Sequence, residues 1–153
     1  MEHTLVRPAN GDEYVGHVPV GQLTGTGTFR CAKDGAVYTG EYEGNRFHGI
    51  GELTSADGNV YLGQFKGGNR EGDGVYTWAN GNVYRGQFKG DKREGDGVLT
   101  RANGRLTFGE WKEDTMEVSS VPFDAANPTH AAGLRAPNEA EARRVGAPHR
   151  RRA

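Results

Sequence analysis

Tyr61-Leu62-Gly63-Gln64-Phe65 is the stretch that decides the fold, because its pattern recurs along the chain at a fixed spacing. The same Tyr-x-Gly-x-aromatic pattern begins at Tyr38 and at Tyr84, so the three tyrosines are 23 residues apart. A Gly-x-Gly pair begins seven residues after each second aromatic. A period of roughly 20 to 50 residues is typical of an elongated array of repeats rather than of a globule.

Each repeat is predicted to contain two strands. Alternation with period two places Tyr61, Gly63 and Phe65 on one face of a first strand. A second strand follows the Gly-x-Gly pair, and its aromatic or aliphatic residue comes two positions after the second glycine. These residues are Phe29, Leu53, Tyr76 and Leu99. Between the two strands we expect a loop rich in charge and glycine, at Lys66 to Glu71 in one repeat and at Lys89 to Glu94 in the next.

Successive repeats are joined by Asp-Gly or Asn-Gly dipeptides, which favour a type I′ turn with positive φ at both central residues. Such turns would pair neighbouring repeats antiparallel. The sequence therefore predicts an all-β fold, an elongated single-layer antiparallel β-meander with two strands per repeat. Glycines at the third position of the pattern would leave room for the tyrosine rings. The predicted turns are Asp34-Gly35, Asp57-Gly58, Asn80-Gly81 and Asn103-Gly104.

These residues resemble the MORN repeat, and the resemblance covers residues 14–113. It divides the chain into repeats at 14–37, 38–60, 61–83 and 84–106 and a partial repeat at 107–113, after an N-terminal segment at 1–13. The end units are irregular: Val18 replaces the second aromatic of the first, and Thr107 stands in place of the tyrosine of the last. The resemblance implies a scaffold that holds membranes, cytoskeleton or flagellar parts together through protein contacts.

Composition excludes several classes of protein. Only 34% of the 153 residues are hydrophobic and 25 are glycine, which argues against a deep core. The formal charge of −1 makes nucleic acid an improbable partner. Cys31 is the only cysteine, so no intramolecular disulfide can form. Because no signal core and no long apolar run is present, we expect a cytoplasmic protein, associated with the cytoskeleton, a flagellum or the inner face of a membrane.

No constellation for catalysis or metal binding is found in the sequence. The Gly-x-Gly pairs lack the lysine and the Ser/Thr of a phosphate-binding loop. The five histidines show no ligand spacing, and no nucleophile lies in a recognisable catalytic set. We therefore predict a protein that is not an enzyme and binds no cofactor or metal.

The predicted aromatic face is the candidate surface for a protein partner. Its rings either form the hydrophobic core or present their edges to a partner helix or strand, and in a one-layer sheet both can hold. Trp78 is the strongest single candidate, because Ser55 and Arg101 fill the same slot in neighbouring repeats. The other candidates are Tyr38, Tyr42, Tyr61, Phe65, Tyr76, Tyr84, Phe88 and Trp111.

The C-terminal part has a different composition. Residues 114–136 are expected to be a linker with little structure, and residues 137–153 a mostly disordered basic tail with one short helix beginning near Asn138. Whether that helix forms, and whether it docks on the sheet, stays open. The tail offers an alternative function, peripheral binding to anionic phospholipid. Its candidate residues are Arg143, Arg144, Arg150, Arg151 and Arg152.

Two function hypotheses therefore stand. The leading one is a non-enzymatic scaffold or adaptor that binds a protein through the aromatic face, with a cytoskeletal or flagellar partner. The alternative is the membrane binder acting through the basic tail. The sequence also allows homo-oligomers, since two arrays can join end to end.

Overall fold

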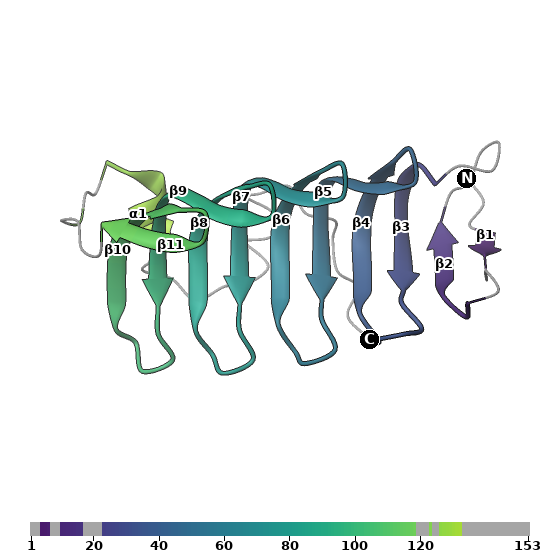
Figure 1. The fold of residues 1–153 in the computed structure, drawn as a ribbon, viewed down its shortest axis with the longest axis horizontal. Coiled ribbons are helices and arrows are strands. Elements are labelled where there is room, and N and C mark those ends of the chain that lie inside the picture. The colour runs from purple at the N-terminus through teal and green to yellow at the C-terminus, as the bar shows by residue number, and fades with distance from the viewer. Residues whose placement is uncertain (1–3, 7–9, 17–22, 119–122, 124–125, 133–153) are drawn as a thin grey trace.

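Eleven strands form one sheet in the computed structural model, which describes residues 4–6, 10–16, 23–118, 123 and 126–132. Every strand pairs antiparallel with the next one in the chain, so the sheet is an open meander (Figure 1). This confirms the predicted all-β single-layer fold. The strands are β1 (Thr4–Val6), β2 (Glu13–Gly16), β3 (Gly25–Arg30), β4 (Val37–Glu43), β5 (Arg46–Thr54), β6 (Val60–Lys66), β7 (Asn69–Thr77), β8 (Val83–Lys89), β9 (Lys92–Thr100), β10 (Leu106–Lys112) and β11 (Thr115–Val118).

One face of the sheet, which we call the inner face, carries the aromatic rings. The first aromatic of a repeat contacts the second aromatic of its own repeat and of the next one. Tyr61, for example, meets Phe65 and Phe88 edge to face, with both ring centroids at 5.0 Å. Such perpendicular contacts suit the quadrupoles of the rings. They form one continuous chain of buried residues: Tyr14, Tyr42, Tyr38, Phe65, Tyr61, Phe88, Tyr84 and Trp111.

The first tyrosine ring of each repeat lies directly over a pair of glycines. Gly63 and Gly74 face each other across β6 and β7, and a Cβ added to Gly74 would lie 2.6 Å from Cζ of Tyr61. The Tyr61 hydroxyl donates a hydrogen bond of 2.8 Å to the carbonyl of Gln64. The prediction that these strand glycines make room for the rings is therefore confirmed.

The predicted loops at Lys66 to Glu71 and at Lys89 to Glu94 are wrong. β6 continues to Lys66, a two-residue turn follows at Gly67-Gly68, and β7 begins at Asn69. The equivalent turn of the next hairpin is Gly90-Asp91, and all four of these turn residues have positive φ. The remaining residues of the predicted loop belong to the two strands. Their pairing contains a β-bulge, where Gly72 has a φ of 88° and the strand register shifts opposite Gln64.

The Asp-Gly and Asn-Gly turns do pair successive repeats antiparallel, but they are not type I′ turns. In Ser55–Asn59 only Gly58 has positive φ, and its N–H donates to the Ser55 carbonyl at 3.0 Å. The next turn is connected to this one, since Asn59 Oδ1 accepts a hydrogen bond of 2.9 Å from the N–H of Ala79. The type I′ signature therefore belongs to the opposite end of each hairpin, which we call the hairpin tip. In Figure 1 the ends of β5, β7 and β9 that carry these tips bend over the upright part of the sheet.

Buried tyrosines make the stability of the sheet sensitive to alkaline pH. Burial raises the pKa of Tyr38, Tyr42, Tyr61 and Tyr84 well above the ordinary value of about 10. The folded state therefore keeps protons that the unfolded state loses, and this stabilisation is complete below pH ~10 and is lost as the pH rises further. We expect a lower urea midpoint at pH ~11 than at pH ~8. Reversible ionisation of all four tyrosines near pH ~10 in the folded protein would contradict their burial.

Candidate functional site

The structure divides the predicted partner-binding rings into two groups. Seven are buried, each no more than 4% exposed: Tyr38, Tyr42, Tyr61, Phe65, Tyr84, Phe88 and Trp111. Tyr76 and Trp78 are half-buried at the border of this core. Burial favours a packing role for the first group and leaves Tyr76 and Trp78 as the rings that a partner reaches directly. Contact between a partner and any of the nine rings stays a prediction.

Trp78 lies at the start of a turn that holds it in place. Its N–H donates to the carbonyl of Asn82 at 2.9 Å, and its carbonyl accepts from Gly81 at 2.9 Å. Its ring lies 4.7 Å from that of Tyr76. Together they form part of a cleft of about 230 Å³ on the inner face, lined by Arg70, Tyr76, Trp78, Phe88, Arg93 and Asp114.

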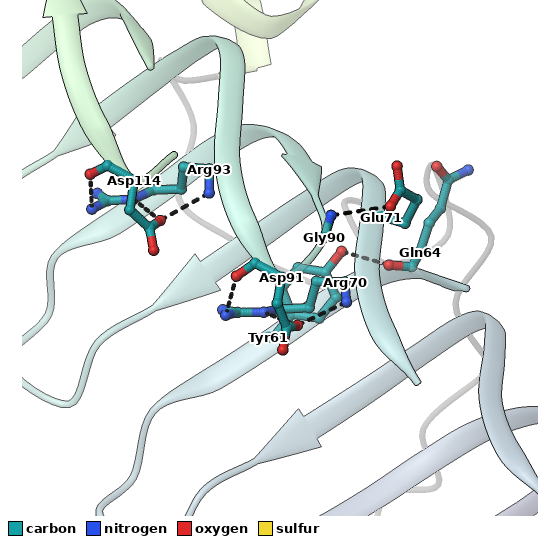
Figure 2. Close-up of polar contacts among 8 residues, drawn as sticks. All are labelled: Tyr61, Gln64, Arg70, Glu71, Gly90, Asp91, Arg93 and Asp114. Atoms are coloured by element: carbon teal, nitrogen blue, oxygen red, sulfur yellow. Dashed lines mark hydrogen bonds and ion pairs between the residues drawn. The ribbon is translucent and has the colours of Figure 1, made fainter. Parts of the chain in front are cut away.

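Two arginines of this cleft are held by aspartates of the following hairpin tip. Nε of Arg70 donates to Oδ1 of Asp91 at 3.0 Å and Nη2 donates to the Asp91 carbonyl at 2.5 Å, while the Arg70 backbone N–H also donates to Oδ1 at 2.9 Å. Arg93 repeats the three contacts on Asp114 at 2.8 to 3.0 Å. Figure 2 shows both pairs, which we call the Arg–Asp clasps. Each clasp joins two neighbouring tips and fixes the plane of a guanidinium group.

The clasped arginines cover aromatic rings of the core. In an earlier repeat the equivalent residue is Phe47, which stacks on Tyr38 at 3.8 Å. Arg70 and Arg93 replace that aromatic cover with a cation, at distances expected for cation–π contacts. The guanidinium of Arg70 lies 5.1 to 5.8 Å from Tyr61, Tyr76 and Phe88, and that of Arg93 lies 5.7 Å from Trp78 and Tyr84.

The Asp114 carboxylate stays charged in this setting. Burial acts to raise its pKa, but hydrogen bonds from the backbone and guanidinium of Arg93 and the charges of Arg93 and Arg70 outweigh burial, so the pKa lies below its ordinary value. The cleft therefore contains ionised groups of both signs beside exposed aromatic edges.

Glu71 and Glu94, which occupy the slot that His48 fills in an earlier repeat, join neighbouring hairpin tips. Glu71 Oε1 accepts a hydrogen bond of 3.1 Å from the N–H of Gly90 (Figure 2). Glu94 makes the equivalent contact of 3.3 Å to the N–H of Glu113. These acidic residues therefore have a structural explanation.

Sequence reasoning missed an ordered segment on the opposite, outer face of the sheet. Residues 114–136, expected to be a linker with little structure, contain β11 and a helix, α1 (Pro128–Ala132), which packs against β8 and β9. His130 of α1 is 4% exposed, and its ring lies 4.8 Å from that of Phe108 on β10. Phe123 lies 5.3 Å from the same ring.

The outer face carries buried valines and a phenylalanine where this segment docks. The row of paired positions begins with Leu5 and Val15 and passes through Thr28, Thr39 and Glu52. It continues through Leu62, Val75, Arg85 and Val98 to Phe108. Asn127 caps α1 by accepting from the N–H of Thr129 at 2.9 Å. The signal that could have revealed this docking site is the run of Val75, Val98 and Phe108 at positions where an open sheet exposes polar residues.

Replacing Phe108 with alanine should release α1. A five-residue helix is unstable in isolation, so it depends on its contacts with the sheet. We expect amide hydrogen exchange at residues 129–132 to accelerate at least ~10-fold, which corresponds to ~1.4 kcal/mol. Leu62→Ala is the matched control, since Leu62 fills the same outer-face slot two repeats earlier. Equal exchange in the wild type and the Phe108 variant would show that the ring does not hold α1.

Some sequence predictions fall outside the described part of the chain. The expected helix near Asn138 and the candidate lipid-binding residues Arg143, Arg144, Arg150, Arg151 and Arg152 belong to residues 133–153. Within the described ranges, no group of three or more histidine, cysteine, aspartate or glutamate residues is arranged to hold a metal ion. Across those same ranges, no helix has the length and apolar character needed to cross a membrane.

Comparison with solved structures finds significant matches. One similar structure is the SAS-4 (dCPAP) TCP domain of Drosophila melanogaster, solved in complex with a proline-rich motif of Ana2 (dSTIL). It is 15% identical, the match covers 72% of each chain, and the TM-score is 0.32, which is too low to bear on function. No curated protein is significantly similar to the chain in sequence.

The repeats themselves match a known family. The family model of the MORN repeat matches three consecutive segments, 38–60, 61–83 and 84–104. The first two carry the boundaries that the tyrosine spacing predicts, and the structure shows each as a hairpin whose glycines support a buried tyrosine. Residues 38–104 of the chain are therefore three consecutive MORN repeats.

Proposed function

We propose that this protein is a non-enzymatic scaffold or adaptor that binds a protein partner at the inner-face cleft beside Trp78. MORN repeats are commonly protein- or membrane-interaction modules and are non-enzymatic. The observation that carries the proposal is the position of Trp78, whose half-buried ring borders a cleft next to a continuous aromatic core. Family resemblance alone supports a cytoskeletal or flagellar structure as the partner.

The cleft has the features of a protein-binding hot spot. Tryptophan, tyrosine and arginine are the residues that most often dominate binding energy, and this cleft contains all three. Their positions are fixed before binding by the turn of Trp78 and by the Arg–Asp clasps. Little side-chain entropy is then lost when a partner binds.

Trp78→Ala should weaken partner binding by at least ~30-fold, since removal of a hot-spot residue costs about 2 kcal/mol or more. The partner is first identified by affinity capture from the native cell, and its dissociation constant is then measured with both purified proteins. Arg101→Ala is the matched control, because it changes the same slot in the next repeat. Circular dichroism and thermal unfolding of each variant verify the fold. Unchanged affinity for the Trp78 variant would place the partner elsewhere.

A further inference from the structure

The guanidinium groups in the cleft keep hydrogen-bonding capacity that the clasps do not use. Arginine has five N–H donors, and each clasp uses Nε and Nη2. Across the described residues, Nη1 of Arg70 and Nη1 of Arg93 make no hydrogen bond. Each arginine is only about a quarter exposed, so these donors lie where solvent is partly excluded. A carboxylate is the acceptor that suits such a donor best.

The walls of the cleft are aromatic. Tyr76 and Trp78 form one side with their rings 4.7 Å apart, and Phe88 lies beneath Arg70. The guanidinium of Arg93 lies 5.7 Å from the Trp78 ring. A ligand that presents a carboxylate to the arginines therefore places its neighbouring side chain against the indole.

The hairpin tips next to the cleft carry a small excess of cationic residues. The hairpin tips of β6 to β11, at 66–71, 89–94 and 112–114, carry six cationic residues against five carboxylates, a net charge of +1. Asp91 and Asp114 are the clasp partners, so two of these carboxylates already accept bonds from the arginines. The four lysines are exposed: Lys66, Lys89, Lys92 and Lys112.

We propose that the cleft recognises an acidic segment of a protein, in which an aspartate or glutamate stands beside an aromatic residue. The carboxylate binds Nη1 of Arg70 or Arg93, and the aromatic ring packs on Trp78. This inference rests on the proposed function, because it specifies the chemistry of the segment that enters the same cleft.

A random-peptide display selection on the immobilised full-length protein tests the proposal. Peptides that bind the wild type and not Trp78→Ala are sequenced and synthesised, and their affinity is measured by tryptophan fluorescence. We expect an aspartate or glutamate next to an aromatic residue in these peptides. Replacing that residue with asparagine or glutamine should weaken binding to the unaltered protein at least ~10-fold, and high salt should weaken binding of the acidic peptide.

Arg93→Lys supplies the test from the protein side. Lysine keeps the charge but has no Nη1. The Arg93→Lys protein should therefore lose most of its preference for the acidic peptide over the same peptide with asparagine or glutamine. Arg105→Lys, an exposed arginine that does not line the cleft, is the control. Thermal unfolding verifies the fold, and the amide peptides decide the question even if Arg93→Lys does not fold.

The possible outcomes separate the two proposals. If Trp78-dependent peptides show no acidic preference, or bind equally well as amides, this inference is wrong and the proposed function stands. If no Trp78-dependent peptide is selected, both fail. Phosphatidylserine vesicles are the further arm: vesicle binding that Arg93→Lys abolishes, with no acidic peptide selected, would assign the cleft to lipid headgroups and overturn the inference.

Discussion

Gly74→Ala should lower the free energy of unfolding by roughly 3 kcal/mol, at the upper end of the cost of overpacking. The new Cβ would lie 2.6 Å from Cζ of Tyr61, well inside van der Waals contact with the ring. The ring cannot move aside, because Phe65 and Phe88 contact it at 5.0 Å. Urea unfolding at fixed pH measures the loss.

Gly104→Asn is the matched control for this prediction. Gly104 has a φ of 88° and no atom within 4 Å of an added Cβ, and asparagine tolerates that backbone conformation. We therefore expect a loss of less than ~1 kcal/mol. Equal losses for the two variants would mean that backbone conformation, and not the tyrosine ring, explains the strand glycines.

Tyr61→Ala should cost about 4 kcal/mol, as expected when a large buried aromatic side chain is removed. The ring is 1% exposed and joins two repeats through Phe65 and Phe88. Tyr61→Phe keeps that ring and loses only the hydrogen bond to the Gln64 carbonyl, so we expect a loss of about 1 kcal/mol. Urea unfolding and hydrogen exchange along β6 to β8 measure the effects.

A double variant tests whether Gly74 and Tyr61 act through the same contact. Without the ring, the alanine at position 74 has no clash, so the two losses should fall short of additivity by at least ~1 kcal/mol. Additive losses would contradict the direct contact between the ring and this glycine. Tyr76→Ala provides a reference, since Tyr76 pairs with Tyr61 across the strands but is only half-buried.

Much of the sheet was predictable because neighbouring residues decide it. Alternation along six or seven residues assigns Tyr61, Gly63 and Phe65 to one face, and the 23-residue spacing repeats that assignment.

The turns were predicted less well. Both Gly67-Gly68 and Asp57-Gly58 suit a reversal of the chain, but only the first pair adopts positive φ at both residues. The difference between the two turns depends on the bulge opposite Gln64. Oε1 of Gln64 accepts a hydrogen bond from the N–H of Asp73 there only once the strands are paired.

The candidate site was predictable in part. Trp78 was found because it departs from the residues that fill its slot in other repeats. Arg70 and Arg93 were missed because they belong to the repeated pattern itself, and the Asp91 and Asp114 that hold them come from the next hairpin. A search for opposite charges 21 residues apart at successive tips would have found both pairs.

The sequence by itself determined the repeat, the inner face and the glycines beneath each ring, because these follow from periodicity and side-chain size within one hairpin. Only the tertiary structure decided which end of the hairpin is tight, which arginines line the cleft, and where α1 lies. Those features depend on contacts between separate hairpins or between the sheet and the C-terminal segment. Arg70 meets Asp91, and Phe108 meets His130, only after the sheet has formed and brought distant parts of the chain together.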